Sequence, residues 1–271
     1  MVEYETANAI DWLSDFKKEH GASDYAIIKA DDGKQYQVKF NSSNSREFIA
    51  HYIASLIGVP VPPAKIIHIS DYLFEDISEH FTSLNALPSK HYFAVEWYPN
   101  TLKWESSEEF FGELKSVDNF NEFLSIFSYD QYLRNYDRHE HNHIIIREHT
   151  KRKFYNSIDA DRIFAGHDIN NILLEINEYN CHYPNYHGKI LYSFIEDSHF
   201  DNILRYAATI GLIKAEEVAD IISICDQLYG FSPDEKFKIS RFLSERKENI
   251  YEACIRNTKC YTKVTRSLYA D

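Results

Sequence analysis

The strongest guide to the architecture of this chain is Asn135-Tyr136-Asp137-Arg138-His139-Glu140-His141-Asn142, followed by Ile144-Ile145-Ile146 and later by Ile158-Asp159. Asp137 is followed five positions later by an amide, Asn142, and then by two strand-like segments and a second carboxylate, Asp159. Phosphoryl transfer from Mg-ATP needs two carboxylates and an amide of this kind. One Asp orients the attacking hydroxyl and accepts its proton, while an Asn and another Asp hold the metal ions over the phosphates. The stretch therefore predicts a kinase that uses ATP and Mg2+, with Asp137, Asn142 and Asp159 as catalytic residues and the last two as magnesium ligands.

The segments around this stretch explain its spacing. Residues 118–135 have apolar side chains at three- and four-residue steps, which predicts a helix with Asp118 as its N-cap. The isoleucines 144–146 and residues 154–158 read as two strands joined by a charged turn at 148–153. Because a hairpin returns its ends to one place, we expect Asp159 to lie close to Asn142.

Two other interpretations of the same residues remain open. His139-Glu140-His141-Asn142-His143 satisfies the H-E-x-x-H signature of zinc peptidases, which requires both outer histidines on one face of a helix. The three isoleucines that follow favour a strand, so the zinc-peptidase interpretation is disfavoured. The other alternative is a solvated histidine-rich loop without chemistry.

Composition limits the possible functions. The chain has 271 residues and a net charge of −13, which argues against a broad basic surface for nucleic acid or an anionic membrane. No run of about 18 apolar residues and no signal pattern occurs, so we expect a cytoplasmic protein. The four cysteines form no C-x-x-C pair and are expected to be reduced thiols.

The distribution of elements predicts an α+β protein in two parts. Residues 1–100 are expected to form a small antiparallel sheet with one helix, and residues 101–271 a mainly helical part. The predicted strands are 25–29, 36–40, 65–69 and 92–97, and the predicted first helix is 46–57, capped by Ser45. Later helices are expected near 197–210, 214–229 and 233–256.

The first part also offers residues for nucleotide binding. Lys39 on the second strand and Glu47 in the first turn of the following helix fit the ion pair that positions the α- and β-phosphates. The small-residue turn Gly21-Ala22-Ser23 is expected to lie over the phosphates and donate backbone N–H groups to them.

These motifs together resemble the HipA-like kinases. The likeness rests on Tyr36–Phe40, Arg46–Ala50, Leu56–Pro62, the Asn135–Asn142 block with Ile158-Asp159, and the arginine-bearing segment Phe242–Lys247. The resemblance implies a two-lobed protein-kinase-like fold that phosphorylates serine or threonine. It further implies a backbone hinge for adenine at 93–98, which includes Glu96, Trp97 and Tyr98.

Several members of that family are bacterial toxins that phosphorylate an aminoacyl-tRNA synthetase. The resemblance therefore implies a protein substrate of this kind and an antitoxin partner, with no direct contact to nucleic acid or membrane. It also implies an autophosphorylated serine, for which Ser23, Ser42, Ser43 and Ser45 are the candidates.

One departure from the family pattern leaves alternatives open. The family often has a glycine two residues after the metal-binding Asp, whereas this chain continues Asp159-Ala160-Asp161-Arg162. The change puts the mobility of this segment in doubt and adds Asp161 as a further metal ligand. A phosphoinositide-like lipid kinase and a pseudokinase that acts as a binding module are the two competing functions.

Overall fold

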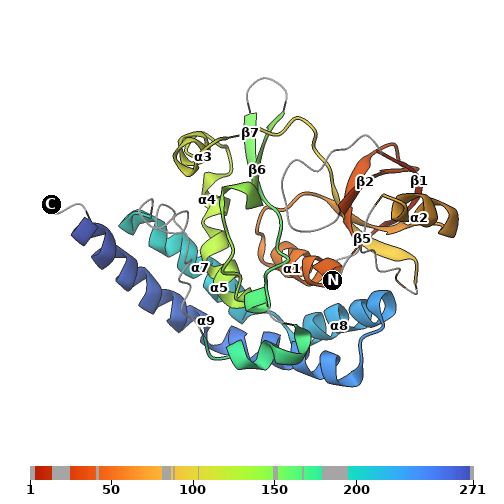
Figure 1. Cartoon of the computed structure of the whole chain (residues 1–271). Helices are drawn as coiled ribbons and strands as arrows, with labels where there is room; N and C mark the ends of the chain where they lie inside the picture. The colour runs from red at the N-terminus through yellow and green to blue at the C-terminus, as the bar shows by residue number, and fades with distance from the viewer. Residues whose placement is uncertain are drawn as a thin grey trace.

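A computed structural model describes residues 4–13, 25–40, 43–80, 87, 89–102, 104–148, 152–166, 168–178 and 195–268, with the backbone alone for 148, 152–154, 175 and 258–268. The predicted phosphate turn Gly21-Ala22-Ser23 lies outside the described residues, as do Ser42 and Cys181. The protein has an α+β fold, with a five-stranded sheet on one side and mainly helices on the other (Figure 1).

The sheet is closed into a small barrel. Its strands are β1 (Thr6–Trp12), β2 (Tyr25–Ala30), β3 (Gln35–Lys39), β4 (Ala64–His68) and β5 (His91–Glu96), in the order β1-β2-β3-β5-β4. The predicted antiparallel pairings of β2 with β3 and of β5 with β3 and β4 are present. The expectation of an entirely antiparallel sheet is wrong, because β1 also pairs in parallel with β4 and closes the sheet.

Strand β1 is not predicted from the sequence, and its structure explains why. The register shifts between Ala9 and Asp11, so an irregularity interrupts the alternation of inward and outward side chains. Only Ala7 and Trp12 of this strand are buried. A strand without a clean two-residue period gives a weak signal in the sequence.

Helix α1 (Ser43–Ile57) lies between the barrel and the helical part (Figure 1). It begins two residues before the predicted cap, and both Ser43 and Ser45 are buried. Asn44 donates to the Phe93 carbonyl at 2.8 Å and accepts from the Phe93 N–H at 3.2 Å, which joins α1 to β5. Tyr229 donates its hydroxyl to the same Asn44 side chain at 2.8 Å, so α1 is also tied to the carboxyl-terminal helices.

The first hundred residues contain a second helix that the sequence analysis did not expect. Helix α2 (Asp71–Ser78) begins after Ser70, whose hydroxyl accepts the Leu73 N–H at 3.3 Å. Its buried residues are Leu73 and Ile77, which pack into the barrel core. Phe74 is half-buried and packs against the same core, but the helix has only eight residues, which is too few to show a clear helical period in the sequence.

The remaining chain consists of a hairpin and helices. The elements are α3 (Ser107–Leu114), α4 (Phe120–Phe123), α5 (Ser125–Leu133), β6 (His143–Glu148), β7 (Arg152–Ser157), α7 (Phe200–Gly211), α8 (Ala215–Tyr229) and α9 (Pro233–Leu268). Short 3-10 turns occur at Glu140–Asn142, Phe164–Gly166, Ile169–Glu175 and Asp197–His199.

The predicted hairpin is confirmed, but the predicted single helix over 118–135 is divided. It falls into α4 and α5 at Leu124 and ends at Leu133, with Arg134 in the left-handed conformation (φ 57°). The cap is Asn119 rather than Asp118, and its side chain does not bind the helix. It instead exchanges two hydrogen bonds with the backbone of Tyr155 in β7, at 2.8 and 2.9 Å.

One hydrophobic cluster joins α1 to the helical part. Its members include Phe48 and Ile53 of α1, Tyr132 of α5 and Phe242 of α9, all less than 1% exposed. Separate clusters fill the barrel and the space beneath the β6–β7 hairpin. Burial of this kind contributes the largest favourable term in folding, so α1 is held against both neighbours. Within the part of the chain that the structure describes, no helix combines the length and apolar character needed to cross a bilayer.

Candidate active site

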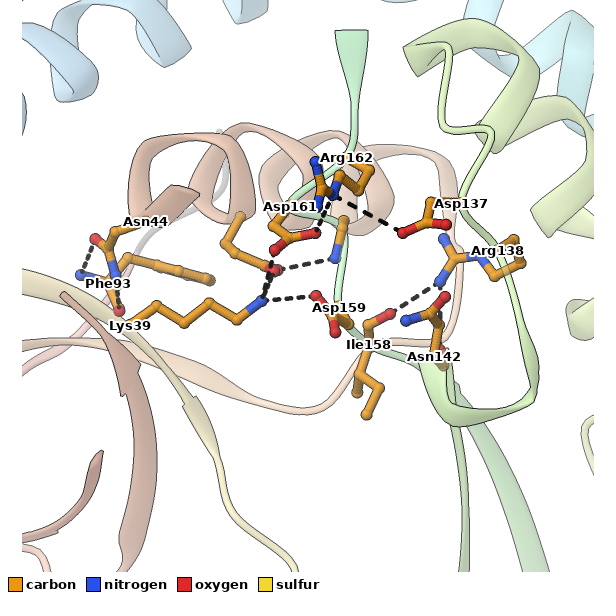
Figure 2. Close-up of polar contacts among 12 residues, drawn as sticks. Lys39, Asn44, Phe93, Asp137, Arg138, Asn142, Ile158, Asp159, Asp161 and Arg162 are labelled. Carbon is orange, nitrogen blue, oxygen red and sulfur yellow. Dashed lines mark hydrogen bonds and ion pairs between the residues drawn. The ribbon is translucent and has the colours of Figure 1, made fainter. Parts of the chain in front are cut away.

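Lys39 is the centre of the site. It lies at the end of β3, and its Nζ is 2.6 Å from Glu47 Oε1 on α1 and 2.6 Å from Asp159 Oδ1 after β7 (Figure 2). Asp161 Oδ2 is 3.7 Å from the same nitrogen. The structure thus brings three of the predicted site residues together, although Lys39 and Asp159 are 120 positions apart.

The charges in this cluster decide the protonation of its groups. Burial alone would lower the pKa of Lys39, but Glu47, Asp159 and Asp161 together raise it, so the amine is a fixed cation. Burial raises the pKa of Glu47 against the opposing effect of Lys39. Burial would also raise the pKa of Asp159, but Lys39 outweighs it and lowers that pKa. The ammonium therefore holds Asp159 as a carboxylate.

The loop that carries Asp137 is built on a buried ion pair. Arg138 donates to both carboxylate oxygens of Asp130 on α5, at 2.7 and 3.0 Å, and neither side chain is exposed. The same guanidinium donates to the carbonyls of Ile158, at 2.9 Å, and of Asn142, at 3.3 Å. One arginine therefore joins α5, the loop and the ends of the hairpin. Next to it, Asp137 has a side chain that is 47% exposed and accessible to a substrate.

A second buried arginine fixes the helix that precedes the loop. Arg246 of α9 donates to the carbonyl of Tyr132 at 2.7 Å and to that of Gln131, both in the last turn of α5. It also donates to the carbonyls of Ile176 and Glu178, at 3.2 and 2.8 Å. A cation at the carboxyl end of a helix satisfies carbonyls that have no partner within the helix. Arg246 thereby fixes the point from which the Asp137 loop leaves α5.

Asn142 lies at the base of the hairpin, as predicted, and close to the segment of Asp159. Its carbonyl accepts the Ile158 N–H at 2.9 Å. Its side-chain oxygen accepts the His139 N–H at 2.9 Å, and the residue is only 3% exposed. The amide therefore stabilises the loop and has one lone pair left on its oxygen for a metal ion.

The oxygen donors suit a hard divalent cation. Asp159 and Asp161 supply carboxylates and Asn142 an amide oxygen, which are ligands that Mg2+ accepts. Asp159 Oδ1 contacts Lys39, and the Asp159 side chain is 41% exposed. The other carboxylate oxygen, Oδ2, is therefore the one available to a metal ion. Among the described residues, no group of three or more His, Cys, Asp or Glu side chains is already arranged around a metal position. The site therefore fits Mg2+ completed by phosphate and water oxygens rather than a cage made of protein alone.

The segment after Asp159 is anchored despite the departure from the family pattern. Asp159 has a left-handed backbone (φ 54°), which Asp tolerates better than most residues. The Ala160 N–H donates to Glu47 Oε2 at 3.2 Å, and Ile163 and Phe164 are fully buried. The backbone of this segment is thus held by α1 and by the central cluster.

The predicted hinge at 93–98 includes the end of β5, and the backbone N–H groups of Glu96 and Trp97 are engaged within the protein. The Glu96 N–H donates to the Pro63 carbonyl and the Trp97 N–H to the Gln35 carbonyl, both at 2.8 Å. The Glu96 side chain pairs with Lys34 at 2.7 Å. The N–H groups of Glu96 and Trp97 are therefore not available to an adenine ring in this conformation.

The zinc-peptidase interpretation is wrong. Residues Glu140–Asn142 form a 3-10 turn, His139 precedes it and His143 begins β6. The two outer histidines therefore do not share one face of an α-helix. His143 is buried, stacks on Phe110 at 4.7 Å between ring centroids and is bonded to the Tyr155 hydroxyl at 2.7 Å.

Sequence reasoning missed Asp130 and Arg162 of the site. Asp130 occupies an apolar face of a predicted helix, and a carboxylate on such a face signals a buried cationic partner. Arg162 follows Asp161 in the chain, but nothing in its sequence position reveals that its side chain approaches Asp137.

The model of the family described as HipA-like kinase matches residues 16–173, which is more than half of the chain. No curated protein sequence matches the chain significantly. The solved structure of a Helicobacter pylori proinflammatory kinase, CtkA, aligns over 97% of this chain and 99% of its own, with a TM-score of 0.59 and 14% identity.

That alignment shows a shared fold. The FAT and kinase domain of CtTel1 aligns over 90% of this chain and 21% of its own, at 12% identity. Its TM-score of 0.28 is too low for a conclusion about the fold.

Proposed function

We propose that this chain, which belongs to the HipA-like kinases, transfers the γ-phosphoryl group of ATP to a serine or threonine hydroxyl of a protein. The observation that carries the proposal is the joining of Lys39 to both Glu47 and Asp159 at 2.6 Å. A lysine held between a helix glutamate and a metal-binding aspartate is the arrangement that orients a triphosphate in protein kinases.

The proposed fold has two lobes. Residues 1–100 would form the nucleotide-binding lobe, with the barrel and α1, and residues 101–271 the catalytic lobe, with the Asp137 loop and the hairpin. In this division Lys39 and Glu47 come from the first lobe and Asp137, Asn142 and Asp159 from the second. The nucleotide would then bind between the barrel and the hairpin, where these residues meet.

Each residue has a defined task in the proposed reaction. Lys39 binds the α- and β-phosphates, and Glu47 holds its amine in place. Asp137 accepts a hydrogen bond from the substrate hydroxyl and takes its proton during transfer. Asn142 and Asp159, with Asp161 as an additional ligand, would hold Mg2+, which when bound would neutralise charge on the phosphate oxygens. Glu96, Trp97 and Tyr98 would border the adenine, and Gly21, Ala22 and Ser23 are proposed for the phosphates from the sequence alone.

The proposed partners follow from the family. The protein substrate would be a component of the translation machinery such as an aminoacyl-tRNA synthetase, and an antitoxin protein would restrain the kinase. ATP and translation proteins are found in the cytoplasm, so the reaction would take place there. Expression of the active protein in bacteria is then expected to slow growth, and the Asp137→Asn variant is expected not to.

The test uses purified protein, radiolabelled ATP, Mg2+ and a bacterial lysate, with and without added phosphoinositide vesicles. Label in protein bands that disappears with Asp137→Asn supports the proposal. Label in the lipid fraction alone would identify a lipid kinase. ATP binding without any transfer would identify a pseudokinase.

A further inference from the structure

Arg162 lies beside the proposed catalytic base, although no part of the proposed function has used it. Its Nε is 3.9 Å from Asp137 Oδ2 and 4.0 Å from Asp161 Oδ1 (Figure 2). The guanidinium thus lies between the proposed base and an additional metal ligand. Its side chain is 48% exposed, so it is accessible to a substrate in the same place.

The backbone that carries Arg162 is fixed on both sides. Before it, the Ala160 N–H is bonded to Glu47, as described above. After it, the Ala165 N–H donates to the Arg134 carbonyl at 2.8 Å, and the Gly166 N–H donates to the Arg162 carbonyl at 3.1 Å. A cation on a fixed segment loses little backbone entropy when it binds a ligand.

Gly166 lies beside both Arg162 and Tyr136. A Cβ at Gly166 would lie 3.2 Å from the Tyr136 hydroxyl, 3.6 Å from Arg162 Cδ and 3.7 Å from Arg162 Nη1. Gly166 also has a φ of +69°, which side-chain-bearing residues rarely adopt. The turn that ends at Gly166 thus lies next to the Arg162 side chain, whose Nε approaches Asp137, and next to the Tyr136 hydroxyl.

The position of the transferred group follows from the position of the base. A base must lie about 2.6–3.2 Å from the oxygen whose proton it takes. The phosphorus is bonded to that oxygen in the product, so its oxygens pass close to Asp137. A guanidinium 3.9 Å from the same carboxylate is within reach of them. Ion pairs between half-exposed groups at such distances are weak, so Arg162 can leave Asp137 for a phosphoryl oxygen at little cost.

We propose that Arg162 is a further catalytic residue, which binds the γ-phosphoryl group while it moves from ATP to the substrate hydroxyl. The inference rests on the proposed function. The bond between the γ-phosphorus and the β–γ bridging oxygen breaks, and its electron pair stays with ADP. The bond from the hydroxyl oxygen to phosphorus forms, and the hydroxyl proton moves to Asp137. Arg162 remains protonated throughout and donates hydrogen bonds to the equatorial oxygens, for which its planar fork is suited.

A neighbouring cation supports this role. Arg46 in the first part of α1 interacts electrostatically with both Asp161 and Arg162. Burial lowers the pKa of Arg46, and the like charge of Arg162 adds to that effect. Asp161, Asp168 and Glu47 oppose this effect, and a bound anion would further offset the repulsion between the two guanidinium groups.

The test compares wild type with Arg162→Ala and Arg162→Lys, and with Arg147→Ala as a matched control. Arg147 is an exposed arginine on β6, outside the proposed site. Loss of a preorganised donor to a transition state costs about 10²–10³-fold in kcat. We expect a loss of this size in kcat for Arg162→Ala, with little change in the KM for ATP, because the contact forms only during transfer. Added guanidinium ion should restore part of the rate to Arg162→Ala and none to Asp137→Asn.

A binding measurement separates this role from a structural one. Mg-ADP with aluminium fluoride mimics the planar phosphoryl group, and wild type and Arg147→Ala should bind it more tightly than Mg-ADP alone. Arg162→Ala should bind Mg-ADP normally but lose the added affinity for the fluoride complex. Unchanged kcat in Arg162→Ala, or a rise only in the KM for the protein substrate, would overturn the inference and leave the proposed function intact. Absence of transfer by the wild type would instead refute the proposed function.

Discussion

Replacing Lys39 with Met removes the cation that joins the two sides of the proposed site. The change leaves Glu47, whose side chain is 12% exposed, as a buried carboxylate without its partner at 2.6 Å. Breaking a buried ion pair on one side costs about 3–5 kcal/mol, because the remaining charge is uncompensated. Glu47 still accepts the Ala160 N–H at 3.2 Å, so we expect Lys39→Met to lower the free energy of unfolding by an amount near the lower end of this range, about 3 kcal/mol at pH 7.

The loss of stability in Lys39→Met should depend on pH, because it arises from the Glu47 carboxylate. Burial already raises the pKa of Glu47 in the wild type, and removal of Lys39 raises it further. A native state with the higher pKa binds more protons than the unfolded state, so the variant gains stability as the pH falls towards that pKa. Asp159 loses the same partner, so its pKa also rises and shifts the stability in the same direction. Carboxylates that do not interact with Lys39 cancel in the difference. The destabilisation by Lys39→Met should therefore be smaller at pH 5 than at pH 7.

The assay is urea unfolding of four proteins at both pH values. They are the wild type, Lys39→Met, Glu47→Gln and the double variant. Glu47→Gln should cost less, about 1 kcal/mol, because Lys39 retains Asp159 and Asp161 as partners. The double variant should cost less than the sum of the two single changes, by about 1–3 kcal/mol. Additive losses, or a loss for Lys39→Met that grows on acidification, would refute the argument that Glu47 is the stranded charge.

Three further changes test other parts of the structure. Arg138→Met leaves the Asp130 carboxylate buried without its cation, so the free energy of unfolding in urea should fall by about 3–5 kcal/mol. A fall of less than about 1 kcal/mol would contradict this. Burial lowers the pKa of His51 to about 4, so the unfolded state alone takes up its proton between about pH 6.5 and 4. The free energy of unfolding of the wild type should therefore fall by up to about 3 kcal/mol as the pH is lowered from 6.5 to 4. It should fall less steeply in His51→Gln, and parallel pH profiles for the wild type and this variant would contradict the reasoning. Gly166→Ala puts a side chain on a left-handed backbone and 3.2 Å from the Tyr136 hydroxyl, beside Arg162, so it should cost about 1–2 kcal/mol and reduce phosphoryl transfer. An unchanged melting temperature and rate would show that this turn is tolerant.

The sequence predicted the parts of the fold that depend on strong local patterns. The β6–β7 hairpin follows from the isoleucine run and the charged turn, and α1 from its apolar face. Pairing of Lys39 with Glu47 follows from their places on a strand and the next helix. These features need no knowledge of distant contacts, because each depends on neighbours in the chain.

Other parts depend on contacts that no local pattern reveals. The barrel closes through β1, whose irregular strand has only Ala7 and Trp12 buried. Helix α4 begins after Asn119, whose side chain pairs with Tyr155, 36 positions away. The approach of Arg162 to Asp137 depends on a turn held by Glu47 of α1 and by the Arg134 carbonyl, just after α5.

The central claim is that Lys39, Asp159 and Asp137 surround one triphosphate. The most direct measurement is a crystal structure of the chain with Mg2+ and a non-hydrolysable ATP analogue. The account predicts that Lys39 Nζ contacts the α- or β-phosphate, that Asp159 binds the metal ion and that the γ-phosphorus faces the Asp137 carboxylate. A nucleotide bound elsewhere, or a γ-phosphate directed away from Asp137, would contradict it.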